Sequence, residues 1–237
     1  NINEMREGAV LLYNNGALPL ASEKQVSLFG HAAVDPVYQG SSAGTKAADG
    51  GLNVINLKTA LEGQGFEVNG ALWDALKAQP TTRATGEGGW GGGAMPTGSA
   101  ANTEENKAFY EGQKNTWASG YKDAAIVVLS REGAEGVDML MKDTDDDGVT
   151  VISSLALHQN EKDLLELVRA EFDKVIVLLN SPYQMEVHEI LPYCDAMLFI
   201  STPGHQGFVG VADILRGEAN PSGRLVDTYA TSSLSAP

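Results

Sequence analysis

Residues 124–129 read AAIVVL, an uninterrupted apolar run with polar residues on both sides. A continuous run of this length is typical of a parallel strand that is covered on both faces. Short apolar segments of the same kind occur at 25–29 (QVSLF), 175–179 (VIVLL) and 196–200 (AMLFI), and stretches with helical spacing separate them. This alternation predicts an α/β fold, a three-layer sandwich in which helices cover both faces of a mostly parallel sheet.

The beginning of the chain has helical periodicity. Ile2, Met5, Ala9 and Leu12 recur at spacings of three and four, and the pattern stops at 14–16 (NNG). We therefore expect an opening helix that ends there. The same reasoning predicts helices at 54–61, 104–120, 185–191 and 207–215, and a short strand at 66–68.

A further helix is expected to begin at Asn160, because Leu164, Val168 and Phe172 share one helical face. Asn160 is a good N-cap residue, and Asp163 stands at the position of its partner in a capping box. By contrast, residues 80–103 are rich in glycine and lack an apolar period, which favours an inserted loop. We interpret residues 1–237 as a single domain that carries this insert.

The composition excludes several classes of protein. The chain has 237 residues, of which 43% are hydrophobic, and a formal net charge of −15. That apolar share argues against intrinsic disorder, and the acidity argues against a nucleic-acid partner. No apolar run has the length of a membrane span. The one cysteine excludes an internal disulfide, but extracellular, cell-associated and cytoplasmic locations all stay open.

The densest group of titratable residues follows the central apolar run. Residues 130–138 (SREGAEGVD) contain the carboxylates Glu132, Glu135 and Asp138 and the guanidinium of Arg131. Ligands of parallel sheets bind beyond the carboxyl ends of the strands, where this segment should lie. Burial there could raise the pKa of one glutamate toward neutrality while the arginine keeps another carboxylate ionised. The alternative is a solvated acidic loop.

Asp143, Asp145, Asp147 and Gly148 match the first half of a calcium-binding loop. The twelfth position is Ser154, where such a loop needs a bidentate glutamate. A solvated acidic turn is therefore the preferred interpretation, and no metal is expected.

Other cofactor and nucleophile motifs are incomplete. The glycines of 40–44 (GSSAG) fit neither dinucleotide nor phosphate-loop patterns, the four histidines are scattered, and no G-x-S-x-G motif is present. We expect no cofactor. Trp73 and Trp117 lie in helical stretches and are expected to pack in the core, whereas Trp90 in the glycine-rich segment is a candidate ligand contact.

Five segments occur in a fixed order: 7–20 (EGAVLLYNNGALPL), 25–30 together with 40–42, 130–138, 203–215 and 220–225 (NPSGRL). In this order and spacing they resemble the α/β sandwich domain of glycoside hydrolase family 3, which includes many β-glucosidases and β-xylosidases. The departures from the family pattern are Tyr13 in place of Lys, and Ala134 and Phe208 in place of Gly.

The resemblance implies a retaining β-glycosidase that releases terminal β-linked sugars from oligosaccharides or glycosides. Its aspartate nucleophile would lie on a separate (β/α)₈ barrel of the same polypeptide, and this domain would supply the acid/base. The family's Arg-x-x-Gly-Glu-x-x-Asp motif aligns that acid/base with Glu135. Glu132 is the rival, because it is three residues away and Ala134 loosens the alignment.

By the same resemblance, Ser41, Ser42, Arg131 and Asp138 are the expected substrate-binding residues. Residues 28–30 and 225–230 look similar to a subgroup in which this domain precedes the barrel. The isolated domain is expected to be inactive. The alternative is a non-catalytic Rossmann-like module that binds a carbohydrate or a nucleotide, and a third interpretation is a structural role.

Overall fold

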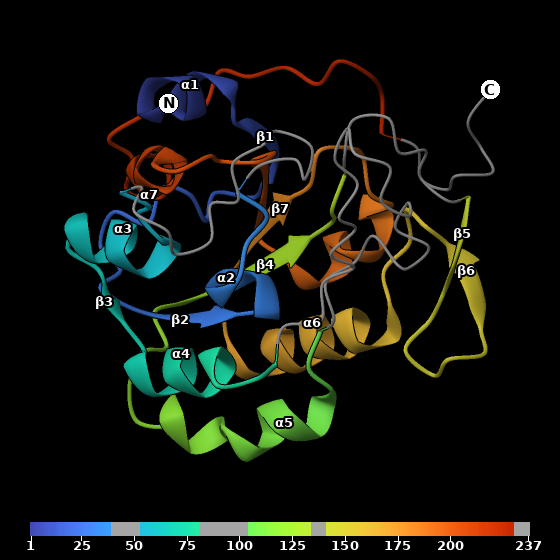
Figure 1. Cartoon of the computed structure of the whole chain (residues 1–237). Coiled ribbons are helices and arrows are strands. Elements are labelled where there is room, and N and C mark those ends of the chain that lie inside the picture. The colour runs from blue at the N-terminus through green and yellow to red at the C-terminus, as the bar shows by residue number, and fades with distance from the viewer. Residues whose placement is uncertain (39–52, 81–103, 134–140, 230–237) are drawn as a thin grey trace.

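The computed structural model describes residues 1–38, 53–80, 104–133 and 141–229. A six-stranded sheet with the strand order β1-β8-β7-β4-β2-β3 lies at the centre, with helices on both of its faces (Figure 1). This confirms the predicted α/β sandwich. The strands are β1 (Val10–Asn14), β2 (Gln25–Phe29), β3 (Glu67–Val68), β4 (Ala124–Ser130), β7 (Val175–Asn180) and β8 (Ala196–Phe199).

The strands β3, β2, β4, β7 and β8 run parallel to one another, and only the edge strand β1 is antiparallel. The central pair β4 and β7 is in register from Ala125 opposite Val175 to Ser130 opposite Asn180. Parallel strands present their carboxyl ends at one edge of the sheet. The segments that follow β2, β4, β7 and β8 therefore begin at the same edge.

Each face of the sheet has its own hydrophobic core. Ile126 and Val128 of β4 point into one core, and Val127 and Leu129 point into the other. Because both faces are covered, β4 is buried along its whole length, which explains the continuous run AAIVVL. One face carries α1 (Ile2–Gly8), α3 (Leu57–Gly63) and α7 (Gly207–Arg216), and the other carries α4 (Gly70–Lys77), α5 (Lys107–Gly112) and α6 (Gln159–Glu171), as Figure 1 shows.

The prediction of an opening helix that continues to residues 14–16 is wrong in its second half. Helix α1 ends at Gly8, and the chain continues as the edge strand β1. This strand pairs with β8 from Val10 opposite Phe199 to Asn14 opposite Ala196. Its backbone hydrogen bonds to the sheet outweigh the helical spacing, since tertiary context overrides local propensity.

Two other helices are shorter than expected. The predicted helix at 104–120 is reduced to α5 and a 3-10 turn at Lys114–Thr116. In place of a helix at 185–191 the structure has the 3-10 turns Val187–Glu189 and Leu191–Tyr193, the second with a proline at its start. Pro192, in the second turn, has no N–H to donate and so cannot continue a helix from the first turn.

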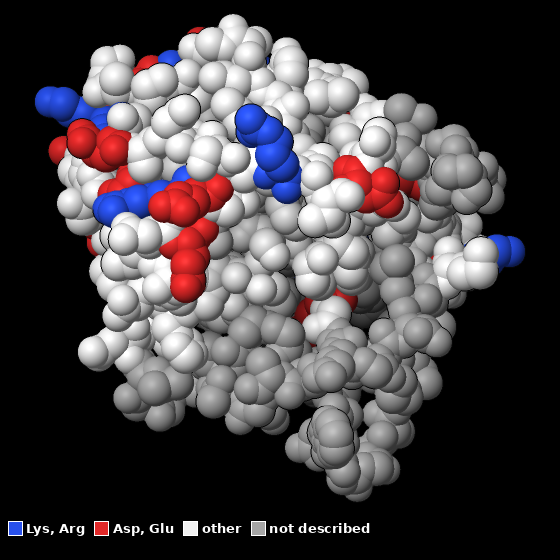
Figure 2. Space-filling model, turned by 90° about the horizontal axis from the view of Figure 1, so that it is seen from above, with Lys and Arg blue, Asp and Glu red and all other residues white. Residues whose placement is uncertain are grey.

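Trp73 and Trp117 are buried in the cores, which confirms their expected packing role. Trp90 and nearly all of the glycine-rich segment lie outside the described residues. Seen from above, the described Lys and Arg side chains lie at separate places, some beside acidic side chains and others among uncharged residues, and they form no continuous basic patch on that face (Figure 2). Across the described ranges, no helix is both long enough and apolar enough to cross a membrane.

Candidate functional site

Asn180, the last residue of β7, joins three of the segments at the carboxyl edge of the sheet. Its Oδ1 accepts a hydrogen bond from the Val37 N–H at 2.7 Å, and its Nδ2 donates to the Val37 carbonyl at 2.9 Å. The same Nδ2 donates to the carbonyl of Ser201, just after β8, at 2.7 Å. Asn180 is fully buried and was missed by the sequence analysis. The feature of the sequence that could have indicated Asn180 is that a polar residue ends an otherwise apolar strand.

Arg131 follows β4 and is fully buried. Its Nη1 and Nη2 donate to the two carboxylate oxygens of Glu161 in α6, at 2.6 and 2.8 Å. The same nitrogens donate to the carbonyls of Ser130 and Ala156, both at 2.8 Å. Burial alone would lower the pKa of Arg131, but the charge of Glu161 raises it above its usual value. The guanidinium therefore stays charged and ties the end of β4 to α6.

Glu132 and Gly133, which follow Arg131, pack against the segment after β7. The Tyr183 hydroxyl donates to the carbonyl of Glu132 at 3.0 Å, and burial raises the pKa of Tyr183 to about 12. A Cβ atom at Gly133 would lie 2.6 Å from Cγ of Pro182, so any side chain at this position would clash. The chain thus leaves β4 along a path that is fixed as far as Gly133.

Of the predicted site residues, Arg131 and Glu132 lie together at the end of β4. Glu135, Asp138, Ser41 and Ser42 lie outside the described residues. Their catalytic and substrate-binding roles stay predictions, as does the role of Arg131 in substrate binding.

After this segment the described chain continues at Met141 and forms an antiparallel hairpin of β5 (Lys142–Thr144) and β6 (Val151–Ser153). Asp147 closes its turn, because Oδ1 accepts hydrogen bonds from the N–H groups of Val149 at 2.8 Å and Thr150 at 2.7 Å. A calcium-binding EF-hand would place helices on both sides of this turn. The hairpin therefore does not have the geometry of an EF-hand. The stretch is not the fully solvated turn that was predicted, because the side chains of Asp143 and Asp145 are only 8% and 11% exposed.

The hairpin also caps α6. Asp145 Oδ1 accepts a hydrogen bond from the Gln159 N–H, and Asp146 Oδ2 accepts one from the Asn160 N–H, both at 2.7 Å. Glu161 Oε2 accepts from the N–H of His158, the N-cap residue, at 2.9 Å. The prediction that Asn160 is the N-cap is therefore wrong by two residues. The first N–H groups of a helix lack partners within it and favour negative charge, which these carboxylates supply.

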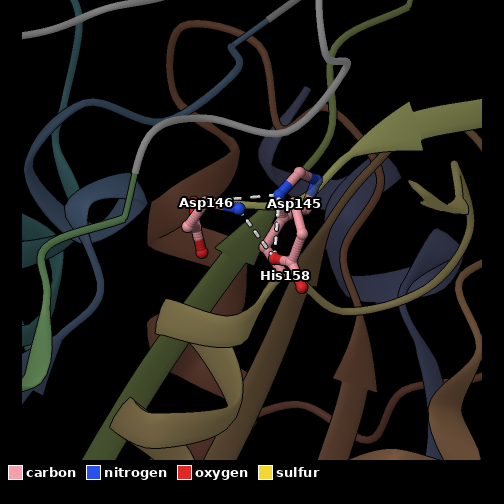
Figure 3. Close-up of side chains that lie close together, drawn as sticks. All are labelled: Asp145, Asp146 and His158. Atoms are coloured by element: carbon pink, nitrogen blue, oxygen red, sulfur yellow. Dashed lines mark hydrogen bonds and ion pairs between the residues drawn. The ribbon is translucent and has the colours of Figure 1, made fainter. Parts of the chain in front are cut away.

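His158 lies among three aspartates (Figure 3 shows two of them). Its Nδ1 is 3.8 Å from Asp145 Oδ1 and 3.8 Å from Asp146 Oδ1, and its Nε2 is 3.3 Å from Asp143 Oδ2. One ligand atom from each of His158, Asp145 and Asp146 lies within 4.8 Å of the others, which is close enough to share a metal ion. However, Asp145 Oδ1 already accepts two backbone N–H bonds. The helix N-terminus also disfavours a cation, so the geometry supports capping.

A second buried cluster lies after β2. Glu104 accepts hydrogen bonds from the Tyr110 hydroxyl at 2.6 Å and from the His31 N–H at 3.0 Å. Burial raises the pKa of Glu104 to about 8. His31 Nδ1 lies 3.0 Å from Glu105 Oε1; burial alone would lower the pKa of His31, but Glu105 raises it above its usual value. No pattern in the sequence indicated this cluster, because His31 and Glu104 are 73 positions apart.

The chain is similar to curated β-glucosidases. It is 29% identical over 231 residues to a β-glucosidase of Ruminococcus albus, a match that covers 94% of this chain and 22% of the relative. It is also 29% identical over 235 residues to a probable β-glucosidase G of Neosartorya fischeri, covering 94% of this chain and 24% of the relative. The chain thus spans about a quarter of the length of these relatives.

Solved structures have the same fold. The structure of a β-glucosidase from Paenibacillus barengoltzii superimposes with a TM-score of 0.73 at 26% identity, over 99% of this chain and 24% of that one. The structure of β-glucosidase 3B from Thermotoga neapolitana, at 23% identity, superimposes with a TM-score of 0.71, over all of this chain and 31% of that one. The family model of the glycosyl hydrolase family 3 C-terminal domain matches residues 9–236. The family model matches nearly the whole chain, and the order of the motifs and the architecture of the sheet agree with it. The chain therefore belongs to glycoside hydrolase family 3, as the domain that this model describes.

Proposed function

We propose that this chain is one domain of a retaining β-glycosidase that releases terminal β-linked sugars, and that Glu135 is its general acid/base. The observation that carries the proposal is the path of the described chain as far as Gly133, two residues before Glu135. This path leaves β4 at the carboxyl edge of a parallel sheet, in a chain that belongs to a glycosidase family. Residues 1–237 form a single domain, and a (β/α)₈ barrel of the same polypeptide completes the site.

Retaining hydrolysis needs two carboxyl groups about 5 to 5.5 Å apart. In the first step Glu135, protonated, donates its proton to the glycosidic oxygen while an aspartate of the barrel attacks the anomeric carbon. In the second step Glu135, now ionised, takes a proton from the water that hydrolyses the glycosyl-enzyme. Ser41, Ser42 and Asp138 would contact the sugar. Arg131 uses both Nη atoms on Glu161 and on carbonyls, so its geometry supports a role in holding the segment.

The test compares Glu135→Ala with Glu132→Ala in the intact enzyme, on phenyl and 2,4-dinitrophenyl β-glucosides. Phenoxide is a poor leaving group and needs the proton, whereas dinitrophenolate does not. We expect Glu135→Ala to lower kcat/KM for the phenyl substrate by about 100-fold or more, while that for the dinitrophenyl substrate changes little. Added azide should then give a β-glycosyl azide, because no general base is needed for its attack.

The control Glu132→Ala should leave the ratio of the two substrates unchanged. The opposite result, with the ratio altered only in Glu132→Ala, would assign the acid/base to Glu132. An intact protein that binds a saccharide and hydrolyses neither substrate would instead be a binding module.

A further inference from the structure

The described residues on both sides of the segment 134–140, which contains Glu135, form hydrogen bonds with the first turn of α6. Three residues before the segment, Arg131 forms its double hydrogen bond with Glu161. Beyond the segment, the hairpin returns the chain to the same turn, where Asp145 and Asp146 accept hydrogen bonds from the N–H groups of α6.

These attachments differ in their exposure to water. The side chains of Arg131 and Glu161 are 0% and 3% exposed, whereas those of Asp145 and Asp146 are 11% and 23% exposed. The buried pair makes strong charge-assisted hydrogen bonds, and the positive end of the helix dipole adds to the more exposed bonds that the two aspartates make. The turn therefore holds the chain at Arg131, before the segment, and at Asp145 and Asp146, beyond it.

We propose that the first turn of α6 positions the acid/base, with Glu161, Asp145 and Asp146 as positioning residues. This inference rests on the proposed function of Glu135. A general acid must lie within hydrogen-bond distance of the oxygen that it protonates, and an error of about 1 Å can cost about 100-fold in rate. By holding Arg131 before the segment and Asp145 and Asp146 beyond it, the turn limits the positions that are open to the carboxyl group of Glu135.

The experiment uses the intact enzyme and the same two substrates. Asp145→Ala and Asp146→Ala each remove one cap. Asp147→Ala is the matched control, because it removes the same charge from the same turn but its side chain bonds only within the hairpin. The readout is kcat/KM, which reports the steps up to formation of the glycosyl-enzyme. In these steps only the phenyl substrate needs a proton from Glu135, because dinitrophenolate leaves without one.

We expect Asp145→Ala and Asp146→Ala to lower kcat/KM for the phenyl substrate by about tenfold relative to the dinitrophenyl substrate. Asp147→Ala should leave this ratio at the wild-type value. Asn accepts the same N–H bonds, so Asp145→Asn and Asp146→Asn should restore most of the ratio. A purely structural role predicts equal losses on both substrates, because it only reduces the amount of folded enzyme.

Gln159→Pro is a second variant that keeps every carboxylate. It removes the N–H that donates to Asp145, at the first helical position, where proline is well tolerated. The preceding His158 already has the extended backbone that proline requires, with φ −73° and ψ 159°. This variant should fold, as melting followed by circular dichroism will show, and it should lower the substrate ratio in the same direction.

Glu135→Ala, measured beside these variants, separates the proposed function from the positioning inference. If it shifts the ratio and the cap variants do not, the positioning inference is overturned while the proposed function stands. If Glu135→Ala itself leaves the ratio unchanged, the proposed function fails, and the positioning inference fails with it.

Discussion

Arg131 and Glu161 form a buried ion pair with two hydrogen bonds, of 2.6 and 2.8 Å, between the end of β4 and the first turn of α6. The pair joins a central strand of the sheet to the same helix turn whose N–H groups donate to Asp145 and Asp146. Its two members stand 30 positions apart in the sequence.

The first prediction concerns the cost of breaking this pair. Glu161→Leu leaves the guanidinium of Arg131 buried without its partner and should lower the free energy of unfolding by about 3–5 kcal/mol. The double variant Arg131→Met/Glu161→Leu removes both charges and should be less destabilised than Glu161→Leu alone. Urea unfolding of the intact protein measures both. If Arg131→Met/Glu161→Leu is less stable than Glu161→Leu alone, this account of the pair is wrong.

The second prediction concerns Asn180. In Asn180→Asp a carboxylate oxygen would replace the amide nitrogen that donates to the carbonyls of Val37 and Ser201. Repulsion and unpaired groups should lower the free energy of unfolding by about 2–4 kcal/mol. Asn115→Asp makes the same change at an exposed position and should have little effect. Similar stability of the two variants would show that Asn180 does not hold these segments together.

The third prediction follows from the pKa of Glu104, which burial raises from 4.5 to about 8. The folded protein keeps a proton that the unfolded chain releases above about pH 4.5, so this contribution to stability is lost progressively as the pH rises toward about 8. The raised pKa of His31 acts in the same direction, since its contribution is present below 6.5 and is lost as the pH rises through the raised value. The melting temperature should therefore fall across this range.

Glu104→Gln cannot release a proton and should flatten this fall, whatever its own melting temperature. Carboxyl groups whose pKa is lowered, such as that of Asp195, change stability only at more acidic pH, so they do not obscure the comparison. Glu111→Gln, at an exposed position, is the control. Parallel pH profiles for wild type and Glu104→Gln would mean that Glu104 is ionised in the folded protein near neutral pH.

Much of the fold could be predicted because it depends on local pattern. The apolar runs at β2, β4, β7 and β8 fixed the strands to within a residue. The same reasoning failed at β1, where Leu12 fits a helical face as well as a strand. Only the hydrogen bonds to β8, far away in the sequence, decide between them.

The polar contacts of the site could not be predicted for the same reason. Asn160 and Asp163 looked like a cap because they are neighbours in sequence, whereas the groups that bond to the first N–H groups of α6 come from 14 residues upstream. Asn180 and Val37 are separated by 143 positions. The density of charge in 130–138 did locate Arg131, but no pattern in the sequence identified Glu161 as its partner.

The fourth prediction separates capping from metal binding at Asp145, Asp146 and His158. If these residues mainly cap α6, Ca²⁺, Mn²⁺ or Zn²⁺ at about 1 mM should not raise the melting temperature, because a ligand stabilises a protein only when it binds the folded state. Asp146→Asn keeps an acceptor for the Asn160 N–H, so it should also fold normally. A rise in melting temperature that one of these ions produces in wild type, and that Asp146→Asn abolishes, would instead identify the cluster as a metal site. The helix N-terminus would then be holding a cation that its dipole disfavours, and the carboxylates would have to outweigh it.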